Sequence, residues 1–131
     1  MATKGNVSFN PQGGPVMLEI SSGYSTTGSF ILSTAKKGEY DFHEFGSGRV
    51  DDNIRDFFLI PIPLQELPNY ILVVNGKYGP APGHQQIRIE YTFTQDSKVL
   101  SVIPDTSEKI EETTNEFFLR FTNFFDFKNG E

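Results

Sequence analysis

The stretch that decides the fold is QIRIEYTFTQ, which runs from Gln86 to Gln95. Apolar side chains occupy every second position: Ile87, Ile89, Tyr91 and Phe93 alternate with Gln86, Arg88, Glu90, Thr92 and Thr94. Because successive side chains of a strand point to opposite faces, this alternation predicts a strand with one buried and one wet face. Asp96 and Ser97 separate it from a second apolar run, Lys98–Ile103, and this two-residue spacer predicts a tight hairpin.

Short apolar runs bounded by Gly, Pro, Asn and Asp continue on both sides of this hairpin. We expect further strands at Val7–Phe9, Val16–Ile20, Ser29–Thr34, Glu39–Phe45, Phe57–Ile60, Tyr70–Asn75 and Phe117–Phe125. About eight or nine short strands with frequent turn residues predict an all-β fold, an antiparallel β-sandwich, with a closed β-barrel as the alternative. The length of 131 residues is that of one domain, so we expect residues 1–131 to form a single sandwich domain.

Three segments interrupt the strand pattern. The prolines at 61 and 63 each remove a ladder donor, so Ile60–Leu64 is expected at a sheet edge or in a crossing between sheets. The GSG sequence at 46–48 is typical of a flexible turn. The segment 105–116 holds five carboxylates against one lysine and opens with the D-x-x-E spacing of a capping box. This segment could form a short helix near 105–114 or an extended linker. In either form, its charges could be a solvated face or an acidic docking strip for a basic partner.

The composition excludes several classes of protein. The chain has no cysteine, which rules out a disulfide scaffold, a Cys-ligated metal site and a thiol nucleophile. Its 11 Lys and Arg against 17 Asp and Glu give a formal net charge of −6, the wrong sign for a phosphate-neutralising surface, so no nucleic acid partner is expected. The longest apolar runs are far shorter than a membrane span, so no transmembrane segment is expected. No secretory signal is visible, and we expect a cytoplasmic protein, or a secreted one if a signal has been removed.

The residues that carry most catalytic chemistry are few. Histidine occurs only at His43 and His84, and nothing in their spacing demands a shared site. The sequence contains no G-x-S-x-G, no dinucleotide-binding G-x-G-x-x-G and no phosphate loop. No pair of carboxylates has a spacing typical of acid–base catalysis. We therefore expect no catalytic residues and no enzymatic activity.

One acidic stretch is a candidate metal site. Asp51, Asp52 and Asp56, together with Asn53, place several hard oxygen ligands close together in the chain. Calcium sites on the loops of β-sandwiches use such ligands, so calcium is the one cofactor that the sequence suggests. The alternative is an Asx turn that leads into the following strand.

Two loops carry the strongest signal for ligand recognition. The segment 75–85 joins two strong strands, is longer than a hairpin needs and is stiffened by prolines, which reduces the entropy lost on binding. The side chains that it offers to a ligand are Lys77, Tyr78, His84 and Gln85. The hydroxyl-rich segment 21–28 surrounds Tyr24, a composition that makes adaptable contacts. In the structural alternative, Tyr78 packs over the end of the core.

The Phe-rich segment 117–127 is a candidate interface. On a strand, one face would carry Phe117, Leu119, Phe121 and Phe125, and the other Phe118, Phe124 and Phe127. Phenylalanine on both faces predicts either a covering layer or a partner subunit. Phe118 and Phe124 are therefore the candidate interface residues.

These features favour a non-catalytic recognition module that uses loops at one end of a sandwich to bind a glycan, a lipid headgroup or a protein. A lectin-like role lacks Trp, the preferred stacking residue for sugars, but Tyr24, Tyr40 and Tyr78 can replace it. The first alternative is a structural protein that self-assembles into a homo-oligomer through its Phe-rich C-terminal interface. The second is a small membrane-acting β-sandwich protein, which the negative charge disfavours.

Overall fold

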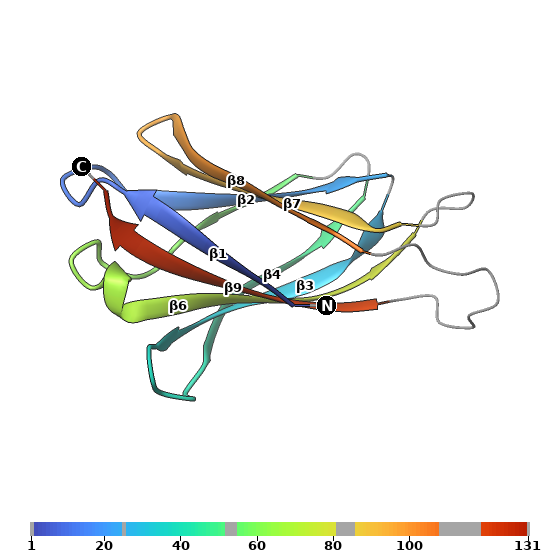
Figure 1. Ribbon diagram of the computed structural model, residues 1–131, viewed down its shortest axis with the longest axis horizontal. Coiled ribbons are helices and arrows are strands. Elements are labelled where there is room, and N and C mark those ends of the chain that lie inside the picture. The colour runs from blue at the N-terminus through green and yellow to red at the C-terminus, as the bar shows by residue number, and fades with distance from the viewer. Residues whose placement is uncertain (1, 25, 52–54, 81–85, 108–118, 131) are drawn as a thin grey trace.

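The structure is a computed structural model that describes residues 2–24, 26–51, 55–80, 86–107 and 119–130. In these residues two β-sheets pack face to face, which confirms the predicted all-β sandwich (Figure 1). Within the described ranges neither sheet closes on itself, so the chain does not adopt the barrel alternative.

The first sheet has five strands, in the order β1 (Ala2–Phe9), β9 (Leu119–Asn129), β6 (Tyr70–Gly79), β3 (Thr27–Lys36) and β4 (His43–Val50). β1 runs parallel to β9, and the other neighbours are antiparallel. The second sheet has four antiparallel strands, in the order β5 (Asp56–Leu59), β2 (Val16–Gly23), β7 (Arg88–Gln95) and β8 (Lys98–Thr106). One 3-10 turn, η1 (Leu67–Asn69), precedes β6.

The strand with the clearest alternation behaves as predicted. Ile89, Tyr91 and Phe93 of β7 are fully buried, and the residues between them are partly exposed. Asp96 and Ser97 have φ angles of 52° and 63°, and two successive positive φ angles are the signature of a type I′ turn. β7 and β8 therefore form the predicted hairpin.

Aromatic rings from the last strand fill the space between the sheets. Phe125 of β9 lies against Tyr91 and Phe93 of β7, with ring centroids 5.0 and 5.1 Å apart, and Phe127 lies 5.8 Å from Phe93. Tilted and edge-to-face pairs of this kind are the geometries that aromatic rings prefer. The predicted outward position of Phe127 is wrong, because β9 keeps its alternation to its end and Phe127 is only 1% exposed.

The proline-rich segment links the two sheets. It follows β5, an edge strand of the four-stranded sheet, and leads through η1 to β6 in the five-stranded sheet. This arrangement confirms the expected crossing at Ile60–Leu64. Ile60 and Leu67, at its two ends, are buried in the core.

β4 is the strand that the sequence misplaced. The expected strand Glu39–Phe45 is wrong in its first half, because β4 begins at His43, and the GSG sequence expected to turn is instead the middle of the strand. A Cβ atom at Gly48 would lie 2.8 Å from the ring of Phe30, and one at Gly46 would lie 3.0 Å from the ring of Phe58. The glycines let these two rings pack against the backbone of β4 and against each other, at a centroid distance of 5.6 Å.

The acidic segment begins inside the fold. Asp105 and Thr106 end β8, and Asp105 is 4% exposed, so the segment does not start as a solvated helix face. Residues 108–116, on which the choice between helix and linker depends, lie outside the described residues.

A buried amide secures the loop between β1 and β2. Gln95 is buried on the core side of β7; its Oε1 accepts from the backbone N–H of Asn10 at 2.8 Å. Its Nε2 donates to the backbone oxygens of Asn10 and Gly14, both at 2.8 Å. One side chain therefore satisfies three backbone groups of a loop more than 80 residues away.

Candidate functional site

An open groove of about 530 Å³ lies where β3 begins and where β4 and β6 end. We call it the basic groove; it is lined by Thr27, Gly28, Ser29, Arg49, Val50, Asp51 and Lys77. Its lining combines two cations, two hydroxyls and one carboxylate. Such a set offers both donors and acceptors to a polar ligand.

Strand register brings the two cations of the groove together. Arg49 of β4 and Lys77 of β6 both pair with Ser29 of β3. Residues paired in an antiparallel sheet project to the same face. The adjacent Phe30 and Tyr78 are buried between the sheets, so Ser29, Arg49 and Lys77 lie on the outer face of the five-stranded sheet.

The ion pairs between described residues lie elsewhere on the molecule. They join Lys37 to Asp126, His43 to Asp41, Arg55 to Glu19 and Arg88 to Glu90. In the part of the chain that the structure describes, neither Arg49 nor Lys77 forms an ion pair. In a protein with a formal net charge of −6, the groove carries two cations against one carboxylate.

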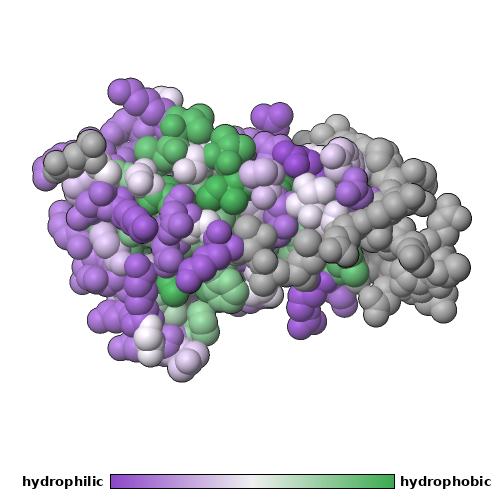
Figure 2. All heavy atoms as spheres, in the orientation of Figure 1, coloured by the Kyte–Doolittle hydropathy of each residue, from purple (hydrophilic) through white to green (hydrophobic). Residues whose placement is uncertain are grey.

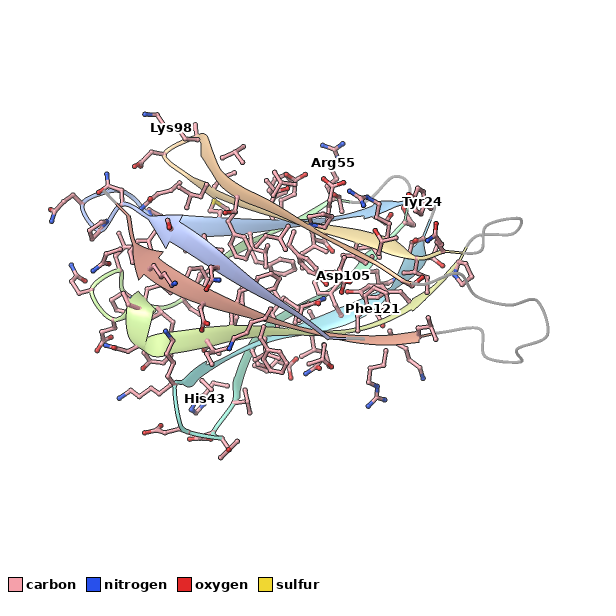
Figure 3. The ribbon with its side chains drawn as sticks, viewed as in Figure 1. Tyr24, His43, Arg55, Lys98, Asp105 and Phe121 are labelled. Atoms are coloured by element: carbon pink, nitrogen blue, oxygen red, sulfur yellow. The ribbon has the colours of Figure 1, made fainter. Side chains whose placement is uncertain are left out.

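Of the five predicted ligand residues, two lie at or near the groove. Lys77 lines the groove, and Tyr24 is 45% exposed in the turn between β2 and β3, at the same end of the sandwich (Figure 3). Tyr78 is fully buried, which is the packing alternative that the sequence left open. His84 and Gln85 lie outside the described residues.

Tyr78 belongs to a group of polar side chains inside the sandwich. Its ring lies over the backbone of Gly76, where an added Cβ would overlap the ring, and it makes an edge contact with Phe121 at 5.5 Å. Nearby, Asn123 Nδ2 donates to the hydroxyl oxygen of Tyr91 at 2.6 Å. Asp105 and Asn123 are also buried.

Burial governs the acid–base behaviour of this group. Removal from water raises the pKa of Tyr78 and of Tyr91 well above the ordinary value. The interaction between the two hydroxyls raises the pKa of Tyr91 further and partly offsets the rise for Tyr78, and the negative charge of Asp105 adds to both rises. Both tyrosines therefore stay neutral at any physiological pH. Because a substrate cannot reach them in this conformation, the group supports packing of the core.

The predicted calcium site stays a prediction. No group of three or more acidic or histidine side chains that could hold a metal occurs among the described residues, and Asp52 lies outside them. The backbone oxygen of Asp51 accepts a hydrogen bond from Ser22 Oγ at 3.3 Å. Asp56 lies in β5, with its carboxylate against Gly48 of β4.

Of the two predicted interface residues, Phe124 is on the outer face of the five-stranded sheet. It lines a hollow of about 270 Å³ with Phe42 and Val73, and Phe42 is half-exposed. Phe118 lies outside the described residues. Phe42 lies in the loop before β4.

The sequence also missed most of the basic groove. Thr27, Ser29 and Arg49 carry no local signal, because they converge only through the pairing of strands that are distant in the chain. The expected strand at 39–45 ended before Arg49, so its face could not be assigned.

No known protein family, no curated protein and no solved structure matches the chain. The architecture therefore assigns the chain to a class, the two-sheet β-sandwich proteins. No helix among the described residues is long and apolar enough to cross a membrane.

Proposed function

We propose that this β-sandwich protein is a non-catalytic recognition module that binds its ligand in the basic groove. The observation that carries the proposal is the convergence of Arg49, Lys77 and two hydroxyls in one open groove. Binding sites of this size are usually concave, with a few polar groups that fix the orientation of the ligand. Tyr24, exposed at the same end, supplies an aromatic face.

A glycan fits this set of groups better than a protein surface. Sugars present many hydroxyls, each both a donor and an acceptor, and the groove offers donors on Arg49 and Lys77 and an acceptor on Asp51. An apolar protein hot spot would need buried aromatic anchors, and the groove has none among its lining residues. A lipid headgroup or a protein ligand is the competing outcome of the test.

The arrangement of titratable groups supports a role without catalysis. The tyrosines whose pKa values are displaced are enclosed in the core and not in the groove. His43 is the first residue of β4 and pairs with Thr34, near the end of β3 that is remote from the groove. Its side chain is exposed, and its Nε2 lies 3.3 Å from a carboxylate oxygen of Asp41. Catalytic groups with tuned pKa values are ordinarily found together in a cleft.

A glycan array followed by calorimetric titration of each positive glycan tests this function. We expect Lys77→Ala and Tyr24→Ala to weaken binding about tenfold, as loss of a charge-assisted or stacking contact does. Lys98→Ala is the matched control, because Lys98 is an exposed lysine at the start of β8, in the other sheet. An array with no positive glycan, or binding that is indifferent to Lys77→Ala, refutes the proposal.

Self-assembly is a second candidate, favoured by one separate observation. The outer face of the four-stranded sheet exposes Phe57 (62%), Leu59 (53%), Val99 (62%) and Val102 (51%). Figure 2 shows hydrophobic side chains gathered over β8, at the edge of that sheet. Exposed apolar faces of this kind are typical of interfaces.

Light scattering over a range of protein concentrations tests this candidate. A homo-oligomer that Phe57→Ser dissociates would support it, and Phe124→Ser, on the opposite sheet, shows which face is used. A monomer at every concentration refutes self-assembly.

A further inference from the structure

The two cations of the basic groove are part of a longer line that crosses the sheet. Arg49 pairs with Ser29, Ser29 pairs with Lys77, and Lys77 pairs with Arg120 of β9. All four side chains are exposed. We call this line the basic row; it crosses four adjacent strands and spans about 14 Å, since neighbouring strands lie about 4.8 Å apart.

The residues next to the basic row in the chain show on which face of the sheet its side chains lie. Phe30, Tyr78 and Phe121 each follow one of its members and are buried between the sheets, as Figure 3 shows for Phe121. Because side chains alternate along a strand, the members of the row all point away from the core. They form one flat line on the outer face of the five-stranded sheet.

The basic row concentrates positive charge in an acidic protein. The chain carries only 11 basic residues against 17 acidic ones, and three of the 11 lie in this row. Lys77 and Arg120 stand directly opposite each other on β6 and β9, so their like charges add on the same part of the surface.

The next line of side chains along the sheet is uncharged and mostly polar. It runs through Ser47, Ile31, Asn75 and Thr122; Ile31 is 45% exposed, and Thr122 Oγ1 donates to Asn75 Oδ1 at 2.9 Å. A ligand lying along the basic row would therefore meet cations on one side and, on the other, hydroxyl and amide groups beside one apolar side chain. This combination matches a molecule that carries both acidic groups and hydroxyls.

We propose that the ligand is an acidic oligosaccharide, with carboxylate or sulfate groups, that lies across β4, β3, β6 and β9 along the basic row. This inference rests on the proposed recognition function and specifies its ligand. The acidic groups pair with Arg49, Lys77 and Arg120, and sugar hydroxyls bond to Ser29 and to Asp51 at the edge of the row. A long nucleic acid is disfavoured, because the formal net charge of −6 repels an extended polyphosphate.

Calorimetry with oligosaccharides of equal length tests this ligand: one sulfated, one built of uronic acids and one neutral, each at roughly 50 and 200 mM salt. We expect the acidic probes to bind at least about tenfold more tightly than the neutral one, and more weakly at the higher salt concentration. Lys77→Ser and Arg49→Ser should each weaken the acidic probes about tenfold. Lys98→Ser, which removes the same charge from the other sheet, should leave the affinity unchanged.

The outcomes separate this inference from the function on which it rests. If the neutral probe binds as tightly as the acidic ones and Tyr24→Ala weakens it, recognition of glycans stands and the acidic ligand is refuted. If Lys98→Ser weakens the acidic probes as much as Lys77→Ser, the attraction is unspecific and the basic row is refuted as a site. The last outcome is that no oligosaccharide binds, that phosphatidylserine vesicles do bind, and that Lys77→Ser abolishes this binding. The ligand is then a lipid headgroup, and the inference of an acidic oligosaccharide is overturned. Thermal melting of every variant verifies that it is folded.

Discussion

Two buried tyrosines on facing strands offer a matched test of the core. Tyr78 of β6 and Tyr91 of β7 are both fully buried, but only one hydroxyl has a well-defined partner. The hydroxyl oxygen of Tyr91 accepts from Asn123 Nδ2 at 2.6 Å. Among the described residues, the hydroxyl of Tyr78 makes no well-formed hydrogen bond; its interaction is with the hydroxyl of Tyr91 across the core. The substitutions Tyr78→Phe and Tyr91→Phe remove the same atom from these two settings.

The two substitutions should change stability to different extents. Tyr91→Phe leaves the amide of Asn123 buried without its acceptor, which costs about 1–3 kcal/mol of unfolding free energy. Tyr78→Phe removes a hydroxyl that makes no well-formed hydrogen bond, so its effect on the unfolding free energy should lie within about 1 kcal/mol of zero. We expect the Tyr91 variant to be less stable than the Tyr78 variant by about 2 kcal/mol, which corresponds to roughly 8 °C in melting temperature.

Urea denaturation followed by far-UV circular dichroism measures this difference, since the chain has no Trp to report by fluorescence. The midpoint should change while the slope m stays constant. A double-mutant cycle supplies the control: Asn123→Ala should couple more strongly to Tyr91→Phe than to Tyr78→Phe. Equal midpoints for the two tyrosine variants, or a larger loss for Tyr78→Phe, would refute the hydrogen-bond assignment.

The remaining predictions concern pH, a buried amide and a glycine. Above the ordinary tyrosine pKa of about 10, the unfolded chain loses the protons of Tyr78 and Tyr91 while the folded chain keeps them, so stability should fall by roughly 1.4 kcal/mol per pH unit for each. Urea midpoints between about pH 9 and 11 measure this fall, and Tyr78→Phe should remove half of the tyrosine contribution. Gln95→Leu removes three hydrogen bonds to the loop between β1 and β2 and should cost about 3 kcal/mol in urea denaturation; a loss below about 1 kcal/mol would show that water replaces them. Gly48→Ala places a methyl group against two side chains and should cost about 1–3 kcal/mol of unfolding free energy. The neighbouring, exposed Ser47→Ala should change that free energy by less than about 0.5 kcal/mol. Equal effects of the two substitutions would contradict the close packing on β4.

The parts of the fold that could be predicted depend on neighbours in the chain. The alternation in β7 and the two-residue turn at Asp96 and Ser97 need no distant partner, and both are confirmed. The prolines of Ile60–Leu64 exclude a central strand by their own chemistry, and the segment crosses between the sheets as expected.

β4 shows why other parts could not be predicted. Gly46 and Gly48 are turn formers in isolation, but the rings of Phe30 and Phe58 need a strand without side chains to pack against. The position of those rings is decided by β3 and β5, not by the residues next to the glycines. Local preference therefore pointed to a turn, and tertiary packing overrides it.

The candidate site, too, could be predicted from the sequence only in part. Lys77 and Tyr24 were recognisable as polar or aromatic residues near loops, and both are exposed at one end of the sandwich. Tyr78 was assigned to the same loop, but β6 continues through Gly79 and its alternation turns Tyr78 inward.

The period-2 pattern of apolar residues is a property of the sequence, so the all-β class and the inner face of β7 follow from it directly. The choice between a sandwich and a closed barrel was decided only by the tertiary structure. Which strands become neighbours, and in which register, depends on how two whole sheets bury their faces against each other. That register alone aligns Arg49, Ser29, Lys77 and Arg120, which stand 20, 48 and 43 positions apart along the chain. A binding surface made by pairing across four strands has no local signature, because its members meet only when the sheet has formed.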